Sequence, residues 1–325
     1  MSKPIFYDSP SVFAVKHKDM NTRLASRSGG IFSALSDFIL DNGGVIYGCA
    51  MTADNTAVHI RAESKQERNR MRGSKYVQSD TSNIMNAVKN DLEHGRNVLF
   101  SGTSCQIAGL RSFLQKDFEN LLCVDIVCHG VPSPKVWRDY VMWQEKRNKS
   151  KCINADFRNK IDFGWNAHVE TLTFENGKSV NSEIYKMLFY NHSILRPCCY
   201  YCPYKDIIHP GDISIADYWG IEKAAPGFDD NLGVSLVLIN NTKGEVYFKK
   251  VEKQIEIRKC NIEDSMQLPL QRSVQVPDMR QKFWNDYEKH GFGYVAKAYG
   301  GYGFINDLKR LYGNTKNRIK SLSKD

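Results

Sequence analysis

The chain has 325 residues, of which 42% are hydrophobic and 25% charged, and its formal net charge is +9. This composition is typical of a folded globular protein with a core of normal size. It argues against a membrane-spanning protein, because no apolar run reaches the roughly 20 residues that a bilayer requires. The start of the chain also lacks the apolar segment of a signal peptide. We therefore expect a cytoplasmic protein, and the positive charge favours anionic ligands or partners.

The first predicted elements alternate between helices and strands. Apolar residues at helical spacing predict a helix over 30–42, which ends at Gly43-Gly44 before a strand over 45–50. A partner strand is expected at 58–62. A further helix, marked by three apolar residues at helical spacing, ends at Gly95.

The segment from 98 to 127 has the pattern of a βαβ unit. A short apolar strand runs over 98–100, a tight Ser/Gly/Thr loop and a helix follow, and a second strand covers 121–127. Such units pair their strands in parallel through a right-handed crossover. Because ligands bind at the carboxyl ends of parallel strands, the candidate binding loops are 101–105 and 128–134.

The second half of the chain is predicted to mix strands and helices. Residues 153–182 alternate like strands with a hairpin turn at Asn176-Gly177, and a helix over 184–192 leads to a cysteine cluster. The later elements are strands at 212–217 and 234–239, a helix at 242–253 and a mainly helical end. Together these elements predict an α/β fold with a mixed sheet and βαβ units.

The nine cysteines fall into two groups. In a reducing compartment disulfides are rare, so clustered cysteines indicate metal binding or catalysis. Four lie in or beside apolar runs and are expected to be small buried side chains: Cys49, Cys123, Cys152 and Cys260. The other five lie in loop-like surroundings: Cys105, Cys128, Cys198, Cys199 and Cys202.

The strongest single motif is Cys199-x-x-Cys202 followed by a proline. Two thiolates from one loop can bind one metal centre, but a cubane iron–sulfur cluster needs four. Cys105 and Cys128 are the natural second pair, because each follows an apolar strand at the same predicted sheet edge. The choice between Cys198 and Cys199 stays open.

Other interpretations of these cysteines are a structural zinc site and unligated thiols. A structural zinc site could be completed by His129, His192 or His209 together with the cysteines. The tyrosines between the cysteines favour an iron–sulfur cluster, because shielding from water tunes the potential of a cluster. Cys105 at a helix start could also be a nucleophile, but no His–Asn/Asp arrangement is evident for a hydrolase.

Two loops in the first hundred residues suit an anion. Ser26-Arg27-Ser28-Gly29-Gly30 precedes a predicted helix, whose first backbone N–H groups can bind an anion. The alternative is an ordinary helix cap formed by Ser28. The second loop, 72–79, offers Gly and Ser for close approach to a phosphate, Lys75 for charge and Tyr76 to cover a ring. Two such loops would suit a dinucleotide such as FAD.

Six short motifs occur in an order that resembles the coenzyme F420 hydrogenase/dehydrogenase beta subunit family. They are Ser26-x-Ser28-Gly29-Gly30, 73–79 (Gly-Ser-Lys-Tyr-Val-Gln-Ser), 102–106 (Gly-Thr-Ser-Cys-Gln), 128–134 (Cys-His-Gly-Val-Pro-Ser-Pro), Cys199-x-x-Cys202 and Asp212-Ile213-x-x-x-Asp217-Tyr218-Trp219-Gly220. The resemblance covers roughly residues 10–260. The family includes deazaflavin-dependent reductases and 7-hydroxymethyl chlorophyll a reductase.

The resemblance implies FAD and at least one 4Fe–4S cluster. The implied flavin-binding residues are Ser28, Gly29, Gly30, Ser74, Lys75, Tyr76, Gln78 and Thr103. The implied cluster ligands are Cys105, Cys128, Cys199 and Cys202. His129, beside Cys128, is the best candidate for a catalytic acid. Three regions are then expected: a flavin-binding region 1–95, an iron–sulfur and flavin region 96–262, and a helical basic extension 263–325.

The expected function is a flavin- and 4Fe–4S-dependent oxidoreductase that passes electrons between a ferredoxin-like donor and a hydride acceptor. The acceptor would be a deazaflavin or another small molecule. No cysteine precedes Cys49, so the ferredoxin-like module of many family members is not expected. Electrons would then come from a separate carrier or a partner subunit. The alternatives are a non-catalytic electron-transfer or docking subunit of a larger complex and a zinc-stabilised binding protein.

The residues from Lys309 onward form a basic tail. One interpretation is a solvated helix end. The other is docking to an acidic protein or peripheral contact with an anionic membrane. We expect no specific nucleic-acid partner.

Overall fold

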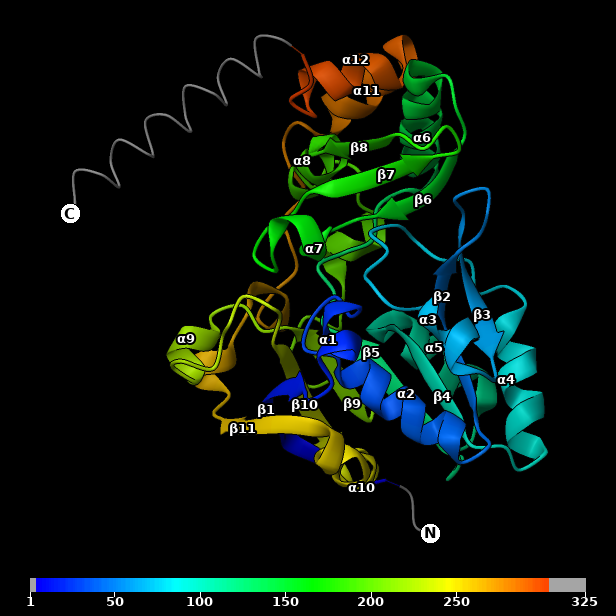
Figure 1. Cartoon of the computed structure of the whole chain (residues 1–325), viewed down its shortest axis with the longest axis vertical. Coiled ribbons are helices and arrows are strands. Elements are labelled where there is room, and N and C mark those ends of the chain that lie inside the picture. Colours follow the sequence, from blue (N-terminus) through cyan, green and yellow to red (C-terminus); the bar gives the residue numbers. More distant parts are fainter. Residues whose placement is uncertain (1–3, 304–325) are drawn as a thin grey trace.

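A computed structural model describes residues 4–303, and its largest element is an eight-stranded mixed sheet (Figure 1). The strand order is β11-β1-β10-β9-β5-β4-β2-β3. The strands of this large sheet are β1 (Phe6–His17), β2 (Val45–Met51), β3 (Ala57–Ala62), β4 (Val98–Thr103), β5 (Leu121–Ile126), β9 (Ile213–Asp217), β10 (Ser235–Asn241) and β11 (Ile255–Cys260). The predicted mixed α/β fold is confirmed.

A second, antiparallel sheet has three strands in the described chain, β6 (Cys152–Asp156), β7 (Glu170–Phe174) and β8 (Ser179–Ser182). The α-helices of the described chain are α1 (Met20–Leu24), α2 (Ile31–Asp41), α3 (Lys65–Asn69), α4 (Ile84–Glu93), α5 (Ser104–Leu114), α6 (Pro134–Asn148), α7 (Lys160–Phe163), α8 (Ile184–Tyr190), α9 (Ile221–Ala224), α10 (Thr242–Val251), α11 (Arg280–His290) and α12 (Phe292–Ala298). Among residues 4–303, every helix is too short or too polar to cross a lipid bilayer.

The centre of the large sheet is parallel and sets the position of the loops. β4 pairs in parallel with β5 and is joined to it by α5, so the predicted βαβ unit is confirmed. β9 pairs in parallel with β5 on its other side. The carboxyl ends of β4, β5 and β9 therefore lie at one edge of the sheet, where parallel α/β sheets bind ligands.

Successive side chains of β4 pack into hydrophobic clusters on opposite faces of the large sheet. Val98 and Phe100 join the hydrophobic cluster that α4 and α5 form on one face. Leu99 joins the cluster of α2 and α10 on the opposite face. All three side chains are fully buried. A strand covered on both faces has to be apolar throughout, which is why this segment has a continuous apolar sequence.

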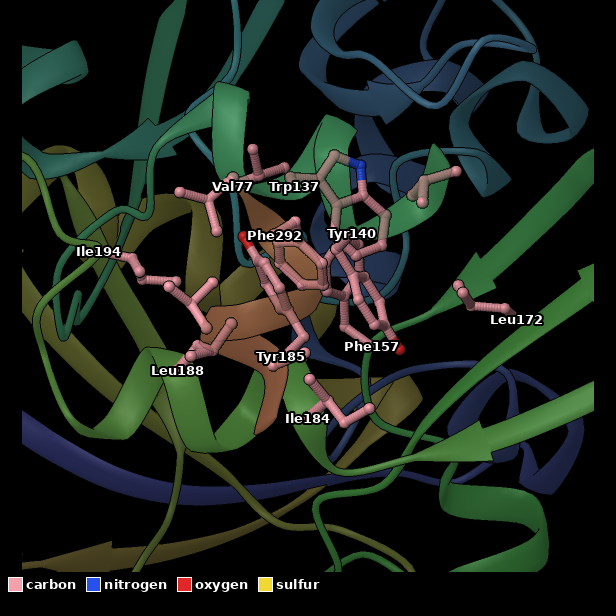
Figure 2. Packing of buried hydrophobic residues seen from close by; sticks show 14 of the residues in the cluster. Val77, Trp137, Tyr140, Phe157, Leu172, Ile184, Tyr185, Leu188, Ile194 and Phe292 are labelled. Atoms are coloured by element: carbon pink, nitrogen blue, oxygen red, sulfur yellow. The ribbon is translucent and has the colours of Figure 1, made fainter. Parts of the chain in front are cut away.

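Helices α6, α8, α11 and α12 pack around β6–β8, and we call these elements the small lobe (Figure 1). The predicted hairpin lies between β7 and β8, where Gly177 has a φ of 79°. Figure 2 shows the aromatic centre of the lobe. The rings of Tyr140 and Tyr185 stack with centroids 5.5 Å apart, and those of Trp137 and Phe157 lie 4.4 Å apart.

The small lobe shares its core with the large sheet. Ala57, at the start of β3, and Val77 belong to the same hydrophobic cluster as Trp137. The indole Nε1 of Trp137 donates to the carbonyl of Asn55 at 2.8 Å, and Nδ2 of Asn55 donates to the carbonyl of Cys152 at 2.9 Å. We therefore expect the two parts to fold as one cooperative unit.

The sequence patterns did not predict β1, β11 and α6. β1 contains Pro10 and shifts its register between Phe6 and Ser11. Proline removes a ladder hydrogen bond and is typical of turns, so the pattern concealed a long strand.

The division into three regions stays a prediction. β1, from the first predicted region, lies between β10 and β11 of the second region within one sheet. The mainly helical character of the last region is confirmed as far as Gly303 by α11 and α12. The basic tail from Lys309 lies outside the described residues.

Candidate functional site

A cavity of about 940 Å³ opens at the carboxyl ends of β4, β5 and β9. Its walls come from the loops that follow these strands, from 26–32 and 71–79, and from Phe189 and Tyr190 of the small lobe. A cavity of this size lies at the upper end of the range for small-molecule sites. It includes both binding loops predicted from the βαβ pattern.

Most of the predicted flavin-binding residues line this cavity: Ser28, Gly30, Ser74, Lys75, Tyr76, Gln78 and Thr103. Gly29 does not line it in the described structure. Its backbone N–H donates to the hydroxyl of Ser235 at 2.9 Å, and a Cβ at this position would lie 2.0 Å from the carbonyl oxygen of Val15. Gly29 therefore allows the loop to pack against β1 and β10, whereas Gly30 contributes to the wall.

The amino terminus of α2 points to an anion site. Its N-cap is Gly30, with a φ of 95° and no side-chain cap among residues 4–303. The alternative cap is not observed, because the hydroxyl of Ser28 donates to the carbonyl of Val234 at 2.6 Å. The first N–H groups of this 11-residue helix can therefore interact with an anion.

The 71–79 loop adds positive charge to the same cavity. Nε of Arg72 is buried without a hydrogen-bond partner among the described residues. Gly73 has a φ of 78°, and a Cβ there would meet no described atom within 4 Å. Nζ of Lys75 donates to the carbonyls of Arg70 and Arg72 at 2.9 and 2.8 Å, and burial lowers the pKa of Lys75 to about 8. A guanidinium with an unpartnered Nε and a glycine with open space beside it fit a phosphate of a dinucleotide.

A chain of hydrogen bonds joins the two cavity loops that carry the 73–79 and 102–106 motifs. Nε2 of Gln106 donates to the hydroxyl of Ser79 at 2.9 Å, and this hydroxyl lies 3.0 Å from Nδ1 of His59. Oε1 of Gln106 accepts from the backbone N–H of Thr103 at 2.9 Å. Burial lowers the pKa of His59 to about 4, so the imidazole is neutral. The sequence motifs included Gln106 and Ser79, but they gave no indication of His59.

Four loop cysteines line the cavity: Cys105, Cys128, Cys198 and Cys199. Cys105 occupies the first turn of α5, as predicted, with its sulfur 3.1 Å from the hydroxyl of Thr103. Cys199 lies in a short 3₁₀ helix, Pro197–Tyr201, and its sulfur is 3.5 Å from the backbone nitrogen of Val131. The loop after β5 and the cysteine loop are therefore in contact.

Three of the predicted ligands interact electrostatically. Burial raises the pKa of the Cys128 thiol to about 12, and the thiols of Cys199 and Cys105 add to the shift. Lys205, which sequence analysis missed, opposes it and donates to the carbonyl of Cys128. Cys202 ends the 3₁₀ turn, where the hydroxyl of Ser273 donates to its carbonyl at 3.3 Å.

Within the described residues, the cysteines near the cavity are not arranged as a complete set of metal ligands. Within residues 4–303, no three His, Cys, Asp or Glu side chains have the arrangement of a ligand set. Cys202 is also absent from the cavity lining of the described chain, whereas Cys198 is present. The choice of the fourth ligand therefore stays a prediction.

The histidines considered for zinc are in different places. His129 lines the cavity, and its Nε2 lies 2.8 Å from Nε2 of His192. Burial lowers the pKa of His129 to about 4. His209 is buried elsewhere, with Nδ1 2.7 Å from a carboxylate oxygen of Asp125. Of the three histidines, His129 is the one that lines the cavity of the described chain together with the cysteines.

Of the four cysteines expected in the core, two are buried and two are half-buried. Cys123 and Cys152 are buried, as predicted. Cys49 and Cys260 are half-buried, and Cys49 lines the cavity beside Lys75, which the sequence pattern did not indicate.

The part of the chain that contains all the loop cysteines matches a known family. The family model for the C terminus of the beta subunit in coenzyme F420 hydrogenase/dehydrogenase matches residues 95–265, more than half of the chain. The chain belongs to this family. The membership indicates a redox, electron-transfer role, and it confirms the resemblance seen in the motifs.

The fold also has a counterpart among solved structures. A chain of the F420-reducing NiFe hydrogenase complex from Methanosarcina barkeri, studied by xenon derivatization, superposes with a TM-score of 0.53. It is 18% identical, and the match covers 80% of this chain and 85% of that chain. At this identity the likeness shows the fold alone. No curated protein matches this chain.

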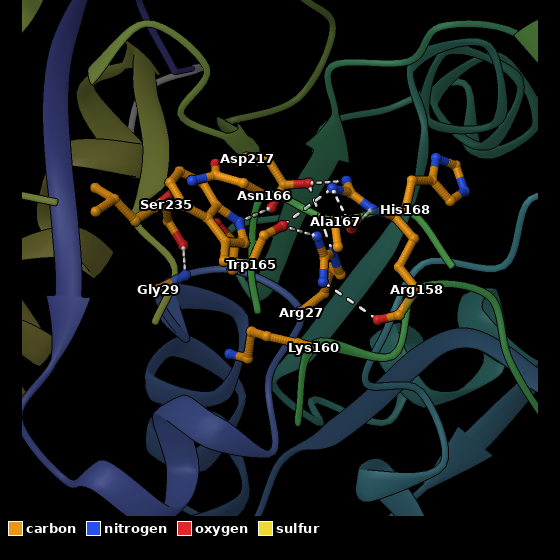
Figure 3. A network of polar contacts seen from close by, with 12 residues as sticks. Arg27, Gly29, Arg158, Lys160, Trp165, Asn166, Ala167, His168, Asp217 and Ser235 are labelled. Atoms are coloured by element: carbon orange, nitrogen blue, oxygen red, sulfur yellow. Dashed lines mark hydrogen bonds and ion pairs between the residues drawn. The ribbon is translucent and has the colours of Figure 1, made fainter. Parts of the chain in front are cut away.

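A second charged wall lines the cavity of this beta-subunit family member. Asp217 accepts from Nη1 of Arg158 at 2.8 Å and from Nε1 of Trp165 at 2.9 Å (Figure 3). Arg27 donates to the carbonyl of Trp165 at 2.5 Å and to that of Arg158 at 3.2 Å. Asp217 belongs to one of the family motifs, but no sequence pattern indicated its arginine partners.

Proposed function

We propose that this chain is a flavin- and 4Fe–4S-dependent oxidoreductase that passes electrons between a ferredoxin-like donor and a small hydride acceptor. The observation that carries the proposal is one cavity that brings the predicted flavin loops together with Cys105, Cys128 and Cys199. Redox cofactors exchange electrons when they lie close together, and the loops of this cavity contain most of the predicted flavin residues and three of the four predicted cluster ligands. The family membership supports the same role.

The flavin would be held by the loops at the start of α2 and at 71–79. The N-terminal N–H groups of α2 and the orphaned Nε of Arg72 suit a pyrophosphate. Tyr76 is fixed at the junction with the small lobe, because the hydroxyl of Tyr185 donates to its carbonyl at 2.8 Å. Its ring can then cover a flat ligand, and the small lobe can exclude water from it.

The cluster would be held by Cys105, Cys128, Cys199 and Cys202. A raised pKa keeps the free Cys128 thiol protonated at neutral pH, so binding of iron would release its proton. Lys205 would offset the negative charge of the bound thiolates. When bound, the cluster supplies single electrons and the flavin supplies hydride chemistry.

His129 is the candidate acid at the cavity wall. It is neutral at pH 7 because burial lowers its pKa to about 4. A neutral imidazole donates through one nitrogen and accepts through the other, so His129 and His192 can share one proton between their Nε2 atoms. This pair would hold a proton beside the acceptor.

Anaerobic purification with iron, acid-labile sulfide and flavin assays tests the proposal. The Cys202→Ala variant is expected to lose most of its iron, because a cubane cluster needs all four thiolates. Cys152→Ala is the matched control and is expected to keep its iron. Equal iron in the two variants would contradict the ligand assignment, and Cys198→Ala decides which neighbouring cysteine is used.

The same preparation separates the enzyme from the docking-subunit alternative. A reductase binds flavin and turns over a small acceptor when purified alone, whereas a docking subunit does neither without its partner. A colourless protein that contains zinc would overturn both. The ferredoxin-like carrier, the partner subunit and the cytoplasmic location are parts of this proposal.

A further inference from the structure

The cavity has an excess of positive charge. In the described chain, five basic residues line it: Arg27, Arg72, Lys75, Arg158 and Arg196. Within residues 4–303, Asp217 is the one acidic residue in this lining. An unbalanced buried charge is unfavourable unless a ligand compensates it. This imbalance indicates a negatively charged occupant.

Two of these cations form a buried cluster around Asp217. The side chains of Arg27 and Arg158 are 8% and 4% exposed. Nε of Arg27 lies 3.8 Å from a carboxylate oxygen of Asp217, beyond hydrogen-bond reach, and it has no hydrogen-bond partner within the described chain. Arg27 lines the cavity, and a guanidinium that is more than nine-tenths buried with one nitrogen lacking a partner carries positive charge that favours an anion nearby.

More positive charge lies behind this wall. Nζ of Lys160 is buried and donates to the carbonyls of Arg23 and Leu232 at 2.7 and 3.1 Å. Burial and the neighbouring Arg27 and Arg23 lower the pKa of Lys160 to about 8. Arg23 is paired with Asp230, whereas the single carboxylate of Asp217 faces both Arg27 and Arg158. The local field therefore remains positive.

Aromatic rings adjoin the two arginines. Trp219 lines the cavity and stacks on Trp165, with centroids 4.9 Å apart and an angle of 11° between the rings. The guanidinium of Arg158 lies 4.9 Å from the centroid of Trp219. Tyr190, from the small lobe, also lines the cavity. A ligand at this wall would meet ring faces as well as cations.

This wall differs from the proposed phosphate site at Arg72. The charged groups that act on Arg72 are Arg68, Asp37 and Asp19. Those that act on Arg27 are Asp217, Arg158, Tyr76 and Asp156. The groups that Arg27 contacts, Asp217 and the carbonyls of Trp165 and Arg158, are not among those that act on Arg72.

We infer that Arg27 and Arg158 form a subsite for the anionic group, a carboxylate or phosphate, of the hydride acceptor. The inference rests on the proposed function, because it names the class of acceptor that would react there. The acceptor would be a small organic anion with a flat portion that lies against Trp219 and Tyr190. Asp217 positions both arginines for this contact.

Binding of benzoate and of inorganic phosphate tests the subsite, with benzyl alcohol as the uncharged control. Calorimetry measures affinity, and tryptophan fluorescence reports changes at Trp165 and Trp219. We expect benzoate or phosphate, but not benzyl alcohol, to bind the anaerobically purified protein. The Arg27→Met variant should bind at least about 10-fold more weakly, because a charged hydrogen bond is lost. Arg196→Met, which removes a cavity cation from the cysteine loop, should stay within about twofold.

The outcomes separate the acceptor from the flavin. Anion binding to flavin-loaded protein, with equal flavin content in wild type and Arg27→Met, supports the subsite. Binding only after the flavin is stripped, or loss of flavin from Arg27→Met, would assign Arg27 to a flavin phosphate and overturn the inference. No binding by wild type, or equal binding by both arginine variants, would overturn it as well.

Two further results keep the test decisive. If Arg27→Met does not fold, Arg27→Lys replaces it, since lysine keeps the charge but loses the planar fork and should still bind more weakly. A protein without flavin or iron would refute the proposed function, yet the benzoate and phosphate titrations would still decide whether the arginine wall binds anions.

Discussion

The carboxyl edge of the large sheet and the small lobe both contribute to the walls of the cavity, but in different ways. The sheet edge uses backbone turns and short polar motifs, such as Gly30 at the start of α2 and Cys105 at the start of α5. The small lobe uses aromatic packing and contributes Phe189 and Tyr190. Chemistry that needs fixed donors is encoded in local motifs, whereas closure of the cavity depends on a core assembled from distant segments.

The core that the small lobe shares with the large sheet provides the first test of this contrast. Trp137 is buried in the small lobe but donates to Asn55 in the loop between β2 and β3. We expect Trp137→Ala to lower the free energy of unfolding by about 3–5 kcal/mol, the usual effect of removing a large buried ring. Urea denaturation followed by circular dichroism measures this change.

Phe100→Ala is the matched variant in the large sheet, because Phe100 is also fully buried. Both variants should shift one common transition, since Ala57 and Val77 join the two cores. A separate early transition in Trp137→Ala alone would mean that the small lobe unfolds independently, and the idea of a cooperative unit would be wrong.

The contrast also explains what could be predicted from sequence. The β4–α5–β5 unit and the position of Cys105 follow from local periodicity and from a glycine-rich turn. Their partners come from segments far away in the chain. Arg158 meets Asp217 only after the small lobe has folded against the sheet, and no local pattern marks that contact. The strand β1 was missed because Pro10 resembles a turn signal.

The large sheet and the small lobe differ in the hydrogen-bond partners that they provide to a buried carboxylate. In the large sheet, the oxygens of Asp125 accept from Ser214 at 2.5 Å and contact Nδ1 of His209 at 2.7 Å. In the small lobe, Oε1 of Glu170 accepts from the backbone N–H of Tyr185 at 2.9 Å, but Oε2 has no hydrogen-bond partner among residues 4–303. Burial raises the pKa of Glu170 to about 7.

This difference predicts a pH dependence of stability from Glu170. Its pKa is higher in the folded than in the unfolded chain, so between about pH 4.5 and pH 7 the folded state binds more protons. The free energy of unfolding should therefore fall as the pH rises through this window, by about 3 kcal/mol in all. Denaturation at several pH values measures the slope.

Glu170→Gln is the variant that isolates this effect. Glutamine cannot ionise, so the fall in the free energy of unfolding between about pH 4.5 and pH 7 should become smaller by about 3 kcal/mol. An unchanged slope in Glu170→Gln would show that the carboxyl group does not titrate in this range, and that the small lobe satisfies its charge in another way.

Two helix starts allow the smallest and most specific comparison. α5 begins with a capping box in which Oε1 of Gln106 accepts from the N–H of Thr103 at 2.9 Å. α3 begins with the same device, in which Glu67 accepts from the N–H of Ser64 at 3.1 Å. Gln106→Ala and Glu67→Ala should each cost about 1 kcal/mol of stability, because each removes one cap.

Only the cap at α5 is expected to affect the site. Gln106 also donates to Ser79 and is adjacent to Cys105, so its loss should loosen two walls of the cavity. Glu67 caps a short helix with no residue in the cavity lining of the described chain. We therefore expect lower flavin and iron content in Gln106→Ala and unchanged content in Glu67→Ala. Equal content in the two variants, at equal stability, would mean that the loops hold their ligands without this bridge, and that the sheet edge depends on packing as the small lobe does.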